Sequence, residues 1–381
     1  MSPRGDPAGE LRLRPGAPLP NIVSTRPAVA RSLLRGLGVD LVPRLLGQLH
    51  ALCGGAHELA ARLALDAARG EAASANGAQR SALGLQAQRE HLRRVWLDWP
   101  RLLGAESDIT ADTLGPLRDL WRQQAGADSA EQARLLRGWL AQHVFGVAPD
   151  HWLDRIASDR AGRLRDWLDR GATGPARWLA ACRDRADELA CDADPALPAS
   201  VDATALAHWL GDWRDARQLP EAQWRGGPRE TGCWTRADGA HAQANRARAS
   251  HARAAGGHDV GAPPGVSAFD RILAKLEEIA RLAAAPGLLA AAGHAVAPGI
   301  GVAWVETARG VLAHIAETDS AGRVLAYDIV SPTEWNFHPE GAAARALALL
   351  APDATVAARD CALLAAAFDP CVAYVVEDAD A

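Results

Sequence analysis

Two cysteines in distant parts of this 381-residue chain have the side-chain chemistry to bind one metal ion together. Cys53 is followed four residues later by His57, and Cys371 comes directly after an Asp-Pro pair. A deprotonated cysteine is a soft ligand that suits iron and nickel, and thiolates from separate segments can share one metal centre. We therefore predict a metal site with Cys53 and Cys371 as ligands.

The remaining cysteines have no comparable context; they are Cys182, Cys191, Cys233 and Cys361. An unpaired cysteine in a soluble chain often serves only as a small buried apolar residue. This structural interpretation stays open for Cys53 and Cys371 when each is considered alone. No C-x-x-C pair or secretory disulfide framework occurs, which is typical of proteins from a reducing compartment.

The surroundings of Cys53 resemble the first metal motif, C-G-x-C-x-x-x-H, of the large subunit of nickel–iron hydrogenases. Aligned on His57, Cys53 takes the second cysteine position and His50 takes the first. Residues 9–13 and 24–36 are similar to the strand and to the S-x-R-P and L-L-R-G runs that precede this motif. The resemblance implies that Cys53 is a bridging thiolate position and that His57 donates a hydrogen bond toward that thiolate.

The surroundings of Cys371 resemble the last motif of the same family, D-P-C-x-x-C-x-x-H/R. Tyr374 stands where that motif has its second cysteine, and Glu377 stands where it has a basic residue. Ala8 occupies the place of a proton-relay glutamate of the family. Only half of the four thiolates is present, so the parts needed for nickel and for proton transfer are missing.

Two further motifs lie between these ends. Residues 306–310 resemble E-A-P-R-G, and residues 331–336 resemble V-P-S/T-T-W-N. In the hydrogenases the corresponding guanidinium and hydroxyl donate hydrogen bonds to the cyanide ligands of the iron. The resemblance implies that Arg309, Pro332 and Thr333, together with His57, surround an Fe(CN)2CO fragment, because charged donors recognise a buried anionic acceptor strongly. The alternative is that Arg309 lies on the surface after a strand and that Thr333 merely ends a turn at Pro332.

Over residues 1–100 and 265–377 the ordered motifs are similar to the HupK/HoxV type of nickel–iron hydrogenase maturation protein. This resemblance implies a non-catalytic scaffold that holds or assembles the Fe(CN)2CO fragment and passes it to the hydrogenase large-subunit precursor. It also implies a HypC-like small chaperone and other maturation proteins as partners. Two alternatives stay open: a metal-free regulatory or chaperone-like binding module with this fold, and a hydrogenase subunit with an altered active site.

The same resemblance implies the fold class α+β, mainly α, with a central helix bundle and small β-sheets. We expect a single domain over residues 1–381, because the two cysteine motifs must meet in space. Alternating apolar residues predict two strands, 311–315 and 324–330, joined by a turn at 319–322. Apolar periodicity predicts several short amphipathic helices, whose tryptophans are expected in the core; these helices cover 132–143, 152–170, 175–189 and 203–213.

Composition narrows the classes of partner. The chain has 49% hydrophobic and 23% charged residues and a net charge of −5. This composition predicts a soluble globular protein without the basic surface that binds nucleic acid. No signal peptide, apolar run of membrane-spanning length or nucleotide-binding glycine motif occurs, so we expect a cytoplasmic protein without membrane partners. Residues 236–265 contain few large apolar side chains and are predicted to form a flexible loop or linker. The spacing of the three histidines there does not match a zinc motif.

Overall fold

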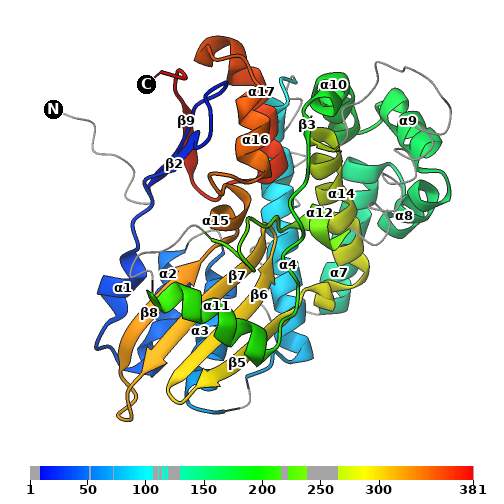
Figure 1. The fold of residues 1–381 in the computed structure, drawn as a ribbon. Helices are drawn as coiled ribbons and strands as arrows, with labels where there is room; N and C mark the ends of the chain where they lie inside the picture. The colour runs from blue at the N-terminus through cyan, green and yellow to red at the C-terminus, as the bar shows by residue number, and fades with distance from the viewer. Residues whose placement is uncertain are drawn as a thin grey trace, which may run out of the picture.

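The computed structural model describes residues 9–50, 53–71, 73–105, 110, 114–115, 117–118, 129–215, 222–237 and 265–380. Helices dominate these residues and small sheets accompany them (Figure 1). The predicted class, α+β with mainly α structure, is therefore confirmed. Most of the predicted loop at 236–265 lies outside the described residues, as do Ala8 and the three histidines of that loop.

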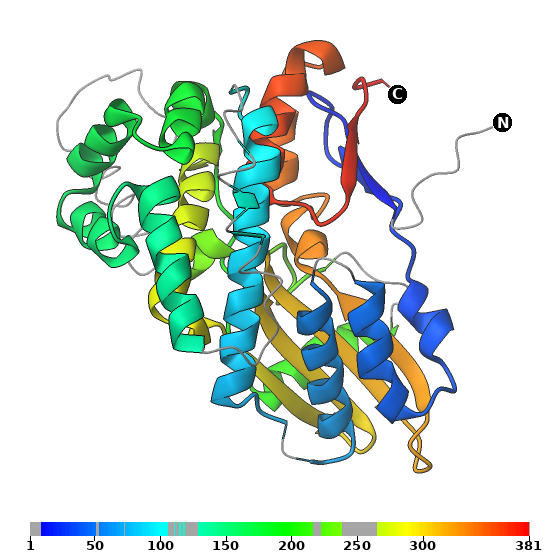
Figure 2. The same ribbon diagram turned by 180° about the vertical axis from the view of Figure 1, so that it is seen from behind.

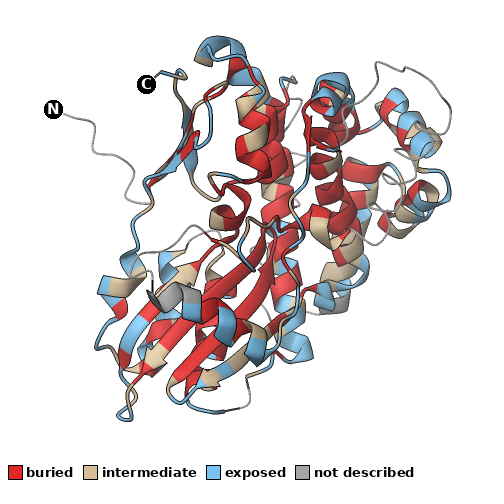
Figure 3. Ribbon diagram, viewed as in Figure 1, coloured by how far each residue is buried: buried red, intermediate tan, exposed pale blue. Residues whose placement is uncertain are grey.

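A four-stranded antiparallel sheet forms one half of the structure. Its strands follow one another in chain order: β5 (Ala291–Ala297), β6 (Ile300–Thr307), β7 (Gly310–Thr318) and β8 (Val324–Val330). The predicted hairpin of β7 and β8 is thus confirmed. Strands β6 and β7 are buried almost throughout, because helices cover both faces of the sheet (Figures 1 and 3).

Helix α3 (Gly54–Ala68) lies on one face of this sheet, beside α2 (Val42–Leu49) (Figure 2). The close approach depends on glycine, since a Cβ atom at Gly301 would lie 2.1 Å from the Ala64 carbonyl oxygen. Helix α11 (Ala203–Asp215) covers the opposite face, where its apolar side chains pack on β6 and β7. The sheet is therefore a rigid support for the start of α3.

The other half of the structure is helical. Its central element is α14 (Ala268–Ala284), where thirteen of seventeen residues are buried; such a helix is surrounded by other elements on all sides. The other segments of this half are α4 (Gly77–Arg93), the π-helical turn η2 (Arg94–Asp98), α5 (Trp99–Leu102), α7 (Ser129–Leu140), η3 (Ala141–Phe145), α8 (Pro149–Ser158), α9 (Arg160–Arg170) and α10 (Gly174–Glu188).

The predicted helices of this region are present, with one difference. The stretch 152–170 is two helices, because Asp159 ends α8 and its carboxylate accepts a hydrogen bond from the Gly162 backbone N–H at the start of α9 (3.1 Å). The expectation that the tryptophans of these helices lie in the core is confirmed for Trp139, Trp152, Trp178 and Trp209, while Trp167 is partly buried against the same core.

The two ends of the chain meet in a small three-stranded sheet. Strand β1 (Glu10–Leu13) pairs antiparallel with β2 (Ile22–Ser24) and parallel with β9 (Ala373–Val376). This pairing anchors the segment of Cys371. The remaining described elements are α1 (Val29–Leu34), η1 (Val39–Leu41), β3 (Ala190–Cys191), α12 (Cys233–Arg236), β4 (Val266–Ser267), η4 (Pro286–Leu288), α15 (Pro332–Asn336), α16 (Ala342–Ala348) and α17 (Ala354–Phe368).

Candidate functional site

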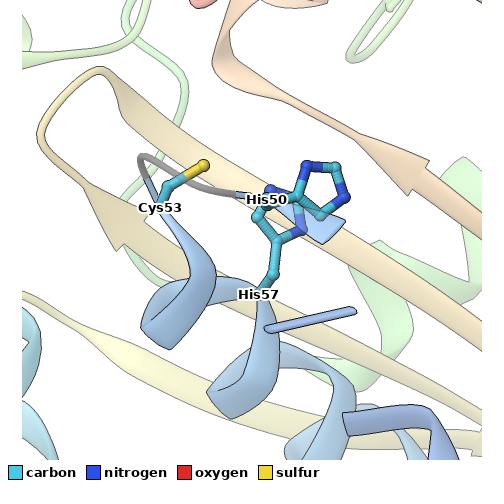
Figure 4. Close-up of side chains that lie close together, drawn as sticks. All are labelled: His50, Cys53 and His57. Carbon is cyan, nitrogen blue, oxygen red and sulfur yellow. The ribbon is translucent and has the colours of Figure 1, made fainter. Parts of the chain in front are cut away.

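Cys53 lies at the junction of α2 and α3, between two histidines. It directly precedes α3, His57 lies in the first turn of that helix, and His50 follows α2. The two imidazole rings stack with centroids 3.5 Å apart (Figure 4). One potential ligand atom from each of the three side chains lies within 4.8 Å of the others. A Cβ atom at Gly54 would lie 2.2 Å from the Gly47 carbonyl oxygen, so glycine permits this tight junction.

Cys371 is held by the start of α15. The Thr333 hydroxyl donates a hydrogen bond to the Cys371 sulfur (3.0 Å) and accepts one from the Cys371 backbone N–H (3.1 Å). Pro332 occupies the first position of α15, where its fixed φ favours helix initiation. Ser331 and Glu334 complete a capping box around it. The helix start therefore presents the Thr333 hydroxyl to Cys371.

Arg309 projects from the two-residue turn between β6 and β7. Gly310 has φ 127° and its Cβ would lie 2.4 Å from the Thr231 side chain, so glycine is needed there. The guanidinium is buried, and its Nη1 donates to Glu90 Oε2 (2.6 Å). Its Nε has no hydrogen-bond partner within the described part of the chain and lies 3.7 Å from Asp369 Oδ1. Arg309 thus retains one unpaired N–H in a buried position.

Asp369 is the centre of a buried ion-pair network. It accepts hydrogen bonds from Arg94 Nε (2.6 Å) and Lys275 Nζ (3.3 Å). Burial alone raises the pKa of a carboxyl group, but Lys275, Arg94 and Arg309 together hold the pKa of Asp369 well below its usual range. Because Arg94 also donates to the Pro370 carbonyl (2.8 Å), this network positions the backbone immediately before Cys371.

Cys53 lies within electrostatic range of Cys371 and of the charged residues around it. Burial raises the pKa of the Cys53 thiol to about 12, and the Glu90 carboxylate raises it further. The positive charge of Arg309 opposes this effect, while Cys371 adds to it. The thiol is therefore protonated in the metal-free protein, and a bound cation would have to displace that proton.

The structure brings the predicted site residues together in two groups, Cys53 with His57 and Cys371 with Thr333, and the charge of Arg309 acts on both cysteines. Two of the predicted donors are engaged differently from the expectation. The Thr333 hydroxyl bonds to the Cys371 sulfur, and the Arg309 Nη1 bonds to Glu90. The alternative interpretations of these two residues are wrong, because Arg309 is buried and Thr333 belongs to the first turn of a helix. Pro332 acts through helix initiation.

The sequence interpretation missed the charged residues that surround Arg309 and Cys371. Glu90 and Lys275 lie on helices at positions that are otherwise apolar and buried. A charged residue at a buried helical position needs a partner, and that signal could have found both. Arg26 was also missed: its Nη1 donates to Ser331 Oγ (2.8 Å) and pairs with Glu334.

Comparisons with known proteins agree with this arrangement. No family model matches the chain. It is 36% identical to the hydrogenase expression/formation protein HoxV of Cupriavidus necator, over 98% of this chain and 96% of that protein. It is 32% identical to HupK of Azotobacter vinelandii, over 97% of each chain, and 32% identical to HupK of Rhizobium leguminosarum bv. viciae, over 94% of this chain and 93% of that protein.

Solved structures share the fold at low identity. An NAD+-reducing NiFe-hydrogenase in the H2-reduced state superposes with a TM-score of 0.52 and 17% identity, over 92% of this chain and 91% of that one. The reduced Ni-Fe-Se hydrogenase of D. vulgaris Hildenborough gives a TM-score of 0.50 and 16% identity, over 92% of each chain. The fold therefore resembles that of the hydrogenase large subunit. Within the described residues, no helix combines the length and apolar character needed to cross a membrane.

Proposed function

This chain belongs to the HoxV/HupK family of hydrogenase expression/formation proteins, and on that basis we propose that it is a non-catalytic scaffold for the Fe(CN)2CO fragment. Its role lies in hydrogenase maturation, as the names of its relatives indicate. In our proposal the protein holds or assembles the fragment and passes it to the hydrogenase large-subunit precursor. The observation that carries the proposal is that the Thr333 hydroxyl and Cys371 contact each other directly, while the buried Arg309 lies close enough to both cysteines for its charge to act on their thiols.

The residues at this place fit an iron that carries small anionic ligands. Cys53 and Cys371 supply two soft ligands from two segments. Arg309 presents an unpaired buried N–H, which a cyanide nitrogen would satisfy with a charge-assisted hydrogen bond. The Thr333 hydroxyl would donate to a second acceptor after rotating away from the Cys371 sulfur. Both donors lie on rigid elements, the β6–β7 turn and the first turn of α15.

The same residues do not fit a nickel site of the hydrogenase type. His50 and Tyr374 occupy two of the thiolate positions. Burial lowers the pKa of His50 to about 4 and raises the pKa of Tyr374, so both are neutral near pH 7. A neutral imidazole and a neutral phenol cannot supply the missing negative charge. This favours an accessory role over an altered hydrogenase subunit.

One observation favours a second candidate, a binding module that carries no metal. Both cysteines are stable without an ion, because the Cys53 thiol is protonated and the Cys371 sulfur accepts a hydrogen bond from Thr333. Such a module would bind a HypC-like chaperone or the large-subunit precursor through its surface alone. The two candidates make opposite predictions about the content of the purified protein.

Infrared spectroscopy distinguishes them. The protein should be purified without oxygen from cells that produce the cyanide-synthesis machinery, because cyanide and carbonyl stretching bands have no counterpart in an ordinary protein spectrum. The scaffold proposal expects both bands together with iron in the sample. The matched sample comes from cells that lack the cyanide-forming proteins and should show neither band. Iron-free protein without these bands in the first sample would favour the metal-free module.

A further inference from the structure

A continuous chain of buried hydrogen bonds runs from the Cys53 junction into the sheet. His57 Nδ1 lies 3.0 Å from His314 Nε2, and His314 Nδ1 lies 2.8 Å from the Tyr327 hydroxyl. His57 comes from α3, His314 from β7 and Tyr327 from β8. The three side chains are 3%, 0% and 1% exposed, so water does not compete for these bonds.

The buried Tyr327 hydroxyl determines which atom donates in each of these hydrogen bonds. Within the described residues, the Tyr327 hydroxyl has His314 as its hydrogen-bond partner and no other. A buried phenol must place its hydrogen on an acceptor, because leaving a buried donor unpaired is unfavourable. Tyr327 therefore donates to Nδ1 of His314. A neutral imidazole has one donor and one acceptor, so Nε2 of His314 carries the hydrogen and donates to Nδ1 of His57.

These hydrogen bonds also determine which ring nitrogen of His57 is protonated. His57 accepts at Nδ1 and must then carry its own hydrogen on Nε2, the nitrogen that does not face His314. Both histidines are in the neutral form that this argument needs, since burial lowers the pKa of His57 well below its usual range and that of His314 to about 3. The reverse direction would leave the Tyr327 hydrogen without an acceptor in the core.

We propose that Tyr327 and His314 are positioning residues that hold His57 in the Nε2–H tautomer, which makes its Nε2 a hydrogen-bond donor, as the family resemblance implies for this position, and not a metal ligand. The side chains of His50, Cys53 and His57 lie close enough together to bind a metal ion. The Nε2–H tautomer instead makes His57 a hydrogen-bond donor in this cluster. An N–H group repels a cation and binds an anionic acceptor, such as a metal-bound thiolate or a cyanide nitrogen. The identity of that acceptor rests on the proposed function, whereas the tautomer does not.

Nitrogen-15 NMR of the metal-free, full-length protein with labelled histidine tests the tautomer directly. The protonated and unprotonated ring nitrogens have well-separated shifts, and the variants His57→Gln and His314→Gln assign the signals. We expect a protonated Nε2 and an unprotonated Nδ1 in both rings of the wild type. A His57 ring protonated on Nδ1 would overturn the proposal, and this measurement needs no variant to fold other than for assignment.

The variant Tyr327→Phe then tests whether the Tyr327 hydroxyl determines the tautomer of the two histidines. Without the phenol hydrogen, Nδ1 of His314 has no donor, and the two rings should lose their exclusive Nε2–H signals. The control is Tyr374→Phe, which removes the hydroxyl of the chain's other tyrosine and should leave both rings unchanged. Retention of the full wild-type pattern in Tyr327→Phe would contradict the role of Tyr327.

These results separate the inference from the proposed function. An Nδ1–H tautomer in the metal-free protein would overturn the inference and leave the scaffold proposal standing. An Nε2–H tautomer in a protein that never shows cyanide bands would overturn the scaffold proposal alone.

Discussion

Thr333 and Cys371 bind each other twice, through a hydroxyl that donates to the sulfur (3.0 Å) and accepts from the backbone N–H (3.1 Å). The two residues lie on different elements, the start of α15 and the turn before β9. One side chain thus fixes both the orientation of the candidate ligand and the path of its backbone.

We expect Thr333→Val to loosen Cys371. Valine has nearly the same shape but cannot form either hydrogen bond, and it leaves the Cys371 N–H unpaired. The free energy of unfolding should fall by about 1 kcal/mol, measured by urea denaturation. Alkylation of Cys371 by iodoacetamide should become faster. Thr318→Val is the control, because the Thr318 hydroxyl makes only a 3.5 Å contact with the Gly299 carbonyl. If both substitutions changed stability and the alkylation rate equally, the two hydrogen bonds between Thr333 and Cys371 would have no specific role in holding Cys371.

Replacing either candidate ligand should abolish retention of the iron fragment without unfolding the protein. Cys53 and Cys371 are each half-buried, so Cys53→Ala and Cys371→Ala create little cavity, while each removes one of two soft ligands. Iron content and the cyanide bands should disappear in both variants. The buried Cys182 lies in a separate apolar cluster, and Cys182→Ala should keep them. A double variant of Cys53 and Cys371 that still purifies with full iron would exclude these ligands.

The positions of the cysteine motifs could be predicted from the sequence because each motif is short and local. The strand-turn-strand of residues 311–330 followed from the alternation of apolar residues. The network around Asp369 could not be predicted in this way. Arg94 and Lys275 come from separate helical segments, and only the packing of η2 and α14 brings both to the Asp369 carboxylate. Glu90 on α4 joins the network through Arg309.

The hydrogen-bond direction at His57 was likewise beyond the sequence. His314 was recognised as part of a strand, but nothing in the spacing indicates which face of β7 it occupies or that Tyr327 lies beside it. The pairing of β7 with β8 places His314 and Tyr327 on the face that α3 covers. The function of the pair therefore depends on the register of the sheet.

Arg309 is expected to be as important for stability as for ligand binding. Arg309→Leu removes the partner of Glu90 and one of the charges near Asp369, both of which stay buried. Loss of one partner from a buried ion pair costs about 3–5 kcal/mol, so we expect this variant to be strongly destabilised in urea.

Arg309→Lys separates the two roles. It keeps the positive charge but loses the planar set of N–H donors. We expect this variant to fold, to retain less of the iron fragment and to shift the cyanide bands more than Thr333→Val does. Unchanged bands in both variants, with iron still bound, would mean that the fragment lies elsewhere.

Stability should fall as the pH decreases from about 6.5 toward 4. Burial lowers the pKa of His314 to about 3 and that of His57 well below its usual range, so both are neutral when folded and protonated when unfolded. A group whose pKa is lower in the folded state contributes stability above its unfolded pKa, and this contribution is lost as the pH falls. For each such histidine the free energy of unfolding falls by about 1.4 kcal/mol per pH unit in this range. The depressed pKa of Asp369 adds its own loss only below about pH 4.

Urea denaturation at several pH values between 7.5 and 4.5 measures this dependence. His314→Gln removes one of the histidines whose pKa is lowered on folding and should flatten the slope. His151 is exposed on α8, and His151→Gln should leave the slope as in the wild type. A His314 variant with the unaltered wild-type slope would mean that the ring does not titrate between the folded and unfolded states as described.

His57→Gln should weaken retention of the iron fragment without eliminating it. The glutamine amide places an N–H donor near the position of the imidazole Nε2, so a donor role survives in part, whereas His57→Leu removes the donor and should lose most of the fragment. If His57 were instead a metal ligand, both variants would lose iron equally, because an amide nitrogen does not coordinate in place of imidazole. Iron content and the positions of the cyanide bands in the two variants decide between these roles. Circular dichroism serves as the control for folding, and an unfolded His57→Gln variant would favour a purely structural histidine.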